Sequence, residues 1–199
     1  MGAVPGQQPR SVSSRAADDL TFIRSAMERS STFTAIPGVG GVVTGAIGLI
    51  AAVVAARQAT ADRWLGIWLA AAVAAIIVEL VAMTWKAHRA GITLTGTTGR
   101  RFALAIAAPL VAGAAITYEL WSVRSFTTMA PAWLLLYGAG VITGGMFSAP
   151  VVRTLGACFM TAGIAAVLTP PAWGNVWLGI GFGGLHVGFG AYIARNHGG

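Results

Sequence analysis

Long apolar stretches alternate with short polar segments along most of this chain of 199 residues. A bilayer core of about 30 Å needs about 20 mainly apolar residues for one helical crossing. All but one of the stretches come close to that length. The shortest is expected to cross by including Thr154, Thr169 and the prolines that follow, or by being tilted or buried. The pattern predicts an all-α, polytopic bundle of six transmembrane helices over residues 35–195, from the stretches Ile36–Ala56, Trp64–Trp85, Phe102–Trp121, Pro131–Ala149, Leu155–Leu168 and Val176–Ala194.

The first 34 residues differ from the rest of the chain. Residues 1–14 are rich in Pro, Gly, Gln and Ser, a composition typical of a disordered tail. In residues 15–34 apolar side chains recur at helical spacing with charged residues between them, which predicts an amphipathic helix on the cytoplasmic membrane surface. Two interpretations stay open, an anchor that covers the inner end of the bundle and a docking or gating helix. The apolar positions are Leu20, Phe22, Ile23, Met27 and Phe33.

Composition agrees with a membrane protein. Hydrophobic residues make up 56% of the chain and charged residues 10%, whereas soluble domains carry about 25% charged residues. The connections between the apolar stretches are too short to hold a soluble domain. We therefore expect a single bundle domain with the lipid bilayer as its surroundings, followed by a short cytoplasmic tail at residues 196–199.

The net charge of +7 is explained by an uneven distribution of basic residues. Lys and Arg concentrate in the cytoplasmic loops of membrane proteins. If the first span leaves the cytoplasm, ten basic residues lie on that side and three on the other. This predicts the inner (plasma) membrane, cytoplasmic N- and C-termini and no nucleic-acid partner. The outer three are Arg57, Arg63 and Arg124, and the inner ten are Arg10, Arg15, Arg24, Arg29, Lys86, Arg89, Arg100, Arg101, Arg153 and Arg195.

Glycines recur four residues apart in three of the predicted spans. Small residues let helix backbones approach closely in lipid, where no hydrophobic force drives helices together. These glycines are therefore predicted to lie at helix–helix contacts, either within one chain or between copies in a homo-oligomer. The pairs are Gly41 and Gly45, Gly140 and Gly144, and Gly184 and Gly188.

Three ionisable residues fall inside the predicted spans, namely Glu79, Glu119 and His186. Such residues are costly in lipid and are functional candidates. At 1.5 Å per residue, Glu79 lies about 9 Å and His186 about 12 Å from the inner ends of their helices. The matching depth predicts a site that binds a proton or a small solute, or else a buried polar pair that fixes helix packing. Glu119 is expected near the outer interface, paired with Arg124.

Each of the three helices that run inward from the outer side begins with tryptophan. Trp64-Leu65-Gly66-Ile67 and Trp177-Leu178-Gly179-Ile180 are nearly the same, and Pro131-Ala132-Trp133 matches Pro171-Ala172-Trp173. Three helical hairpins in parallel repeat would explain these matches. So would the belt of aromatic residues that membrane proteins place at the lipid headgroups.

Motifs for enzymatic chemistry are missing from the sequence. We find no zinc-protease, nucleophile-elbow or phosphate-loop motif, and Cys158 is the single cysteine. We therefore expect no enzyme, no metal and no cofactor. Two functions stay open. One is binding or transport of a small solute or proton near Glu79 and His186, and the other is a non-transporting interaction, sensor or regulatory subunit.

Two terminal motifs resemble known sequences. They are Phe22-Ile23-Arg24 with the segment from Met27 to Gly38, and the ending Ile193-Ala194-Arg195-Asn196-His197-Gly198-Gly199. Both are similar to those of an uncharacterised family of small bacterial six-helix integral membrane proteins. The resemblance implies a bacterial inner-membrane location and six helices, and it brings no catalytic residues.

Overall fold

The computed structural model describes residues 19–20, 22–23, 35–91 and 93–196. In this part of the chain the structure is helical without strands, and six helices are long and apolar enough to cross a membrane. The prediction of an all-α bundle with six such helices is confirmed, and it is compatible with a multi-pass membrane protein. The predicted tail at residues 1–14 lies outside the described residues. So does most of the predicted surface helix at residues 15–34, which is not confirmed.

Five of the six spans are longer than their apolar stretches suggested, and the first is slightly shorter. The first five are α2 (Gly38–Ala55), α3 (Ala61–Ala90), α4 (Thr97–Ser122), α5 (Met129–Gly145, after the short helix η1 at Phe126–Thr128) and α6 (Pro150–Leu168). The sixth, Pro171–Asn196, is continuous through η2 (Pro171–Trp173), α7 (Gly174–Leu178), the π-helical η3 (Gly179–Leu185) and α8 (His186–Asn196).

Local sequence sets several of these boundaries. The Thr60 hydroxyl accepts a hydrogen bond from the Arg63 backbone N–H and caps the start of α3. Gly91 ends the same helix in the left-handed conformation, with φ 64°, which glycine adopts without steric cost. Pro150 begins α6 at a position where its missing N–H costs nothing. This early start gives α6 19 residues, so the fifth span is not short, as its apolar stretch had indicated.

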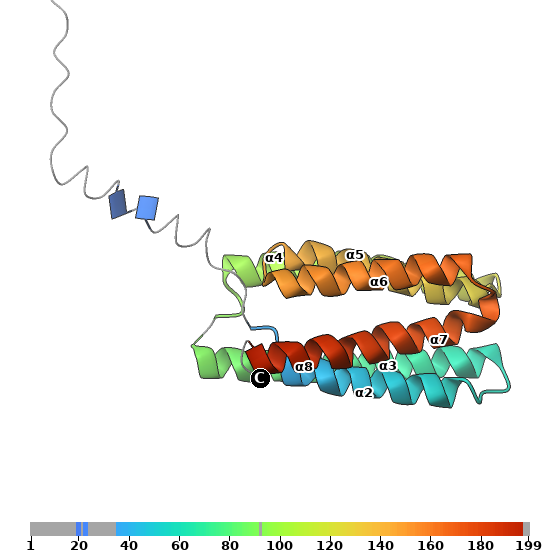
Figure 1. Ribbon diagram of the computed structural model, residues 1–199. Helices are drawn as coiled ribbons and strands as arrows, with labels where there is room; N and C mark the ends of the chain where they lie inside the picture. Colours follow the sequence, from blue (N-terminus) through green and yellow to red (C-terminus); the bar gives the residue numbers. More distant parts are fainter. Residues whose placement is uncertain (1–18, 21, 24–34, 92, 197–199) are drawn as a thin grey trace, which may run out of the picture. The chain divides into compact units, whose positions relative to one another are not determined.

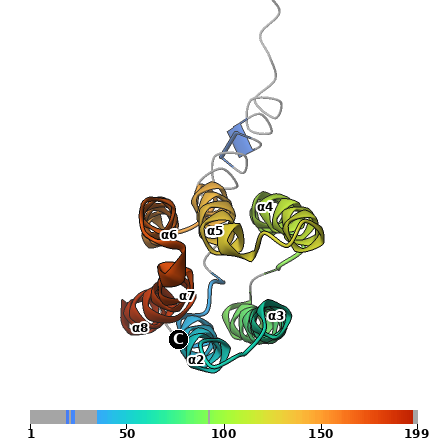
Figure 2. The same ribbon diagram turned by 90° about the vertical axis from the view of Figure 1, so that its right-hand side faces the viewer.

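The six spans form two layers of three helices, seen side-on in Figure 1 and end-on in Figure 2. In one layer α2 lies between α3 and α8, and in the other α5 lies between α4 and α6. The sixth span thus packs mainly on α2, and α6 packs mainly on α5. Three parallel hairpins would require the fifth and sixth spans to pack closely on each other. In the structure each of them packs mainly on another helix.

Glycines bring the helices together within each layer. A methyl group on Gly45 would lie 2.6 Å from the backbone nitrogen of Val187 and 2.8 Å from the carbonyl oxygen of Gly183. In the other layer a methyl group on Gly156 would lie 2.6 Å from the backbone nitrogen of Ile142. Backbone therefore packs directly on backbone along α2 with the sixth span and along α5 with α6.

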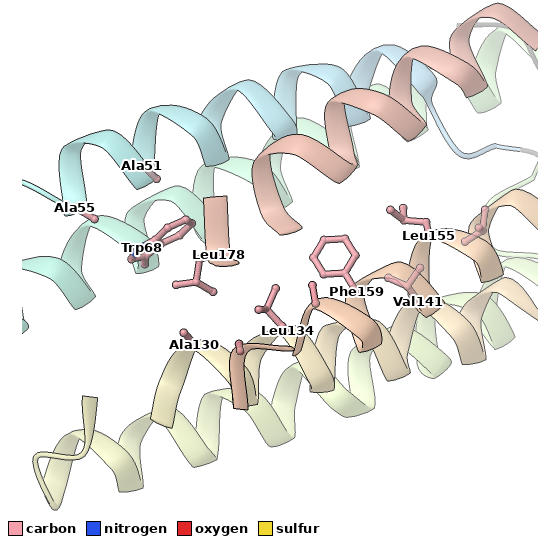
Figure 3. Packing of buried hydrophobic residues seen from close by; sticks show 12 residues of the cluster. Ala51, Ala55, Trp68, Ala130, Leu134, Val141, Leu155, Phe159 and Leu178 are labelled. Atoms are coloured by element: carbon pink, nitrogen blue, oxygen red, sulfur yellow. The ribbon is translucent and has the colours of Figure 1, made fainter. Parts of the chain in front are cut away.

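Larger side chains fill the space between the layers. Figure 3 shows Leu134 of α5, Phe159 of α6 and Leu178 of α7 pointing into this space, and all three are fully buried. A second apolar cluster joins α3 and α4 near residues 83–106, with Ala35, Ala87 and Phe102 at its centre. The layers are thus internally tight units that meet through side chains.

Candidate functional site

Glu79 lies on α3 and is half-buried. Its Oε1 accepts a hydrogen bond of 3.1 Å from the Thr44 hydroxyl of α2. Because α3 continues past Trp85 to Ala90, Glu79 lies eleven residues, or about 16 Å, from the end of its helix. The earlier value of about 9 Å assumed too short a helix.

His186 lies where the π-helical segment passes into α8, and it is 5% exposed. Its Nε2 forms a hydrogen bond of 2.8 Å with the Tyr137 hydroxyl of α5, in the opposite layer. His186 precedes the end of α8 at Asn196 by ten residues, or about 15 Å. The expected match in depth between Glu79 and His186 therefore holds with the longer helices.

Tyr137 is the residue that sequence reasoning missed. Besides its bond to His186, its hydroxyl interacts electrostatically with Glu79. The structure thus joins His186 to Tyr137 across the two layers and Glu79 to Thr44 within one layer, with Glu79 close enough to Tyr137 to influence it electrostatically. A tyrosine at mid-depth in the fourth span was the available signal, because a buried hydroxyl in an apolar helix needs a partner. We call Thr44, Glu79, Tyr137 and His186 the polar centre.

Aromatic rings enclose the inner part of the polar centre. Tyr137, Phe159, Phe182 and His186 all contact one another, with centroid separations from 4.7 Å to 6.2 Å. The His186 Nδ1 is buried near the carbonyl oxygens of Gly181 and Phe182 without a hydrogen bond of normal geometry to either. π-Helical turns shift such carbonyls from their usual partners and are frequent at functional sites.

Glu119 does not join the polar centre. It is exposed on α4, and Arg124, its expected partner, instead forms a double hydrogen-bonded ion pair with Asp62 at the start of α3. Asp62 was overlooked because it lies just before the apolar stretch of its span. The expected pairing of Glu119 with Arg124 is therefore wrong.

The predicted packing glycines divide into two groups. Gly41 and Gly45 contact the sixth span, and Gly140 and Gly144 contact Pro109 and Ile106 of α4. Gly184 and Gly188, by contrast, have no heavy atom within 4 Å of an added methyl group and are exposed. Within the part of the chain that the structure describes, these two glycines do not pack against another helix.

A groove of about 500 Å³ lies beside the open glycines, between α2 and the sixth span. Its walls are almost entirely apolar, and Ala52, Asn175, Ile180 and Gly184 are among the residues that line it. Neither Glu79 nor His186 lines this groove, so it is separate from the polar centre.

In the described residues no group of three or more His, Cys, Asp or Glu side chains comes together in a way that could hold a metal ion. Comparison with protein-family models, curated proteins and solved structures found no match for this chain. The resemblance to small bacterial membrane proteins stays a prediction.

Proposed function

We propose that this chain is an integral membrane protein that binds protons at the polar centre and passes them, alone or with a small solute, between the two sides of the bilayer. The observation that carries the proposal is the bond between His186 and Tyr137, which joins the two layers at the depth of Glu79. Ionisable side chains at mid-depth are costly, and a purely apolar contact would join the layers at lower cost. The concentration of Lys and Arg in the loops on one side supports a location in the inner membrane with both termini in the cytoplasm.

The chemistry of Glu79 favours a proton. Its described hydrogen-bond partner is one hydroxyl, from Thr44. A carboxylate can accept about four hydrogen bonds, and burying it as an anion without a cation is strongly unfavourable. Uptake of a proton removes that charge. His186 can accept or release a second proton across its hydrogen bond to Tyr137.

The packing of the rings also favours a proton over a larger solute. The four rings of the centre already touch one another, so a solute between them would need the layers to separate. A proton needs no such space, because it moves along hydrogen bonds between neighbouring groups. A solute would bind only in a conformation with separated layers.

Proton flux in liposomes tests this function. Purified protein is reconstituted with a trapped pH-sensitive dye, and a potassium gradient with valinomycin drives protons inward. We expect flux above protein-free vesicles and a loss of at least tenfold in Glu79→Gln and in His186→Ala. Glu119→Gln is the matched control and should keep the wild-type rate, since Glu119 is exposed and outside the centre. Wild-type flux at the protein-free level, or equal flux in Glu79→Gln and Glu119→Gln, would refute the proposal.

A second candidate is a non-transporting subunit that associates with another copy of itself. The open face of Gly184 and Gly188 favours it, because identical faces with glycines four apart permit close approach of two helices. The test is Gly188→Cys in a Cys158→Ala background. A disulfide-linked dimer formed in native membranes would support this role, and monomer alone under oxidation would exclude it.

A further inference from the structure

Polar contacts join the two layers at the end of the bundle where α3 begins. Arg124, which follows α4, donates two hydrogen bonds of 2.8 Å to the carboxylate of Asp62 on α3. The Trp121 indole donates a third, of 3.0 Å, to the same carboxylate. Asp62 belongs to the layer of α2, and its partners belong to the layer of α5. This contact therefore ties the layers together by charge at one end.

Two residues further along α3, or about 3 Å, two stacked indoles lie at the same end. Trp64 of α3 and Trp133 of α5 are nearly parallel, with an interplanar angle of 6° and 5.7 Å between ring centroids. This stack, like the ion pair, crosses from one layer to the other. It lies between the ion pair and the polar centre, because Glu79 is fifteen residues further along α3, or about 22 Å.

Each indole of the stack is fixed by its own layer. Trp64 donates a hydrogen bond of 3.0 Å to the side-chain amide oxygen (Oδ1) of Asn175 on α7, and the same oxygen accepts one from Trp68. Trp133 donates one of 2.8 Å to the Thr117 hydroxyl of α4. No hydrogen bond between the two indoles is needed to hold the stack. If the layers separated, each ring would stay attached to its own layer.

The energy of these contacts suits reversible opening. The side chains of Arg124 and Asp62 are 60% and 49% exposed, and solvent-exposed ion pairs contribute little to stability. Within the layers, by contrast, glycine contacts bring backbone against backbone. Separation between layers at this end is therefore easier than separation within a layer.

We propose that the Asp62–Arg124 pair and the Trp64–Trp133 stack form a gate between the two layers, which closes one end of the bundle and opens to admit water to the polar centre. The inference rests on the proposed function for its purpose. Opening breaks the ion pair and parts the two indoles, while Asn175 and Thr117 keep them in their layers. Closing restores the same contacts.

Access of a charged thiol reagent to the polar centre tests the gate. The reporter is Thr44→Cys in a Cys158→Ala background, because Thr44 is 6% exposed and contacts Glu79. Purified protein in detergent micelles is treated with a positively charged methanethiosulfonate reagent. Asp62→Asn, which breaks the ion pair without changing side-chain size, should raise the labelling rate at least fivefold. Trp133→Phe, which shrinks the stack, should act in the same direction.

Two further variants separate gating from general loosening. The double variant Asp62→Arg with Arg124→Asp restores an ion pair of opposite polarity. It should reverse at least half of the change that Asp62→Asn causes in the logarithm of the labelling rate. Arg89→Ala is the control, because the Arg89 guanidinium stacks 3.9 Å over Trp85 of its own helix and joins no layers. It should leave labelling unchanged.

The outcomes separate the gate from the proton function. An unchanged labelling rate in Asp62→Asn and Trp133→Phe would overturn the gate even if protons flow. A raised rate that the charge swap does not reverse would assign the effect to loosening and would also overturn it. A reversible change in labelling without any proton flux in the wild type would support the gate and remove the proton function.

Discussion

The contact of Gly45 with the sixth span allows a quantitative test of the layer architecture. In Gly45→Ala the new methyl group would lie 2.6 Å from the Val187 backbone nitrogen and 2.8 Å from the Gly183 carbonyl oxygen. Ordinary van der Waals contact begins at 3.4 Å. Moving from 2.6 Å to 3.4 Å requires α2 and the sixth span to separate by about 0.8 Å. Because two of the obstructing atoms are backbone atoms, no side-chain rotation relieves the clash.

The same substitution at Gly188 supplies the reference. A methyl group there meets no heavy atom within 4 Å. Replacing glycine by alanine in a helix interior gains up to about 1 kcal/mol of helix propensity, and this gain is common to both variants. Overpacking costs about 1–3 kcal/mol and applies to Gly45 alone. We therefore expect Gly45→Ala to be less stable than Gly188→Ala by about 1–3 kcal/mol.

The assay is reversible unfolding in mixed dodecylmaltoside and SDS micelles, followed by circular dichroism. Gly45→Ala should unfold at a lower SDS fraction than Gly188→Ala. Adding Val187→Ala should recover only part of the loss, because it removes the Val187 side chain and leaves both backbone atoms in place. Equal midpoints for the two single variants would refute backbone-to-backbone packing of α2 on the sixth span. Full recovery with Val187→Ala would refute the part assigned to the backbone.

Two further predictions concern contacts between helices. Asn175→Leu removes three hydrogen bonds, one of them donated to the Ala52 carbonyl oxygen. Each such bond contributes about 0.6 kcal/mol in a membrane protein. The same assay should therefore show a free energy of unfolding lower by about 2 kcal/mol. Asn196→Leu, which removes an exposed bond within α8, should lose much less, and an equal loss would contradict the role of Asn175. Phe159→Ala, at a fully buried ring, should destabilise the protein by about 3 kcal/mol, whereas Ile164→Ala on the exposed face of α6 should have little effect. Similar midpoints for these two variants would contradict the packing between the layers.

The chain by itself determined the number of spans and their approximate positions. Whether a segment can cross a bilayer depends on its own length and apolarity, so six apolar stretches were enough to find six helices. The same local reasoning located Glu79 and His186 at one depth, because depth follows from the residue count along a helix. It erred where the helices extend beyond the apolar stretches, as between Pro150 and Leu155 and between Trp85 and Ala90.

The tertiary structure alone decided which helices pack together and which side chains meet. A soluble helix marks its buried face by apolar periodicity, but a helix long and apolar enough to cross a membrane, such as α3, is apolar on nearly every face. The sequence therefore indicated that a buried Tyr137 needs a partner, but not that the partner is His186, nor that Arg124 binds Asp62 rather than Glu119. Close glycine contacts set the pairing of helices within each layer. Side-chain fit between the layers then placed the polar centre.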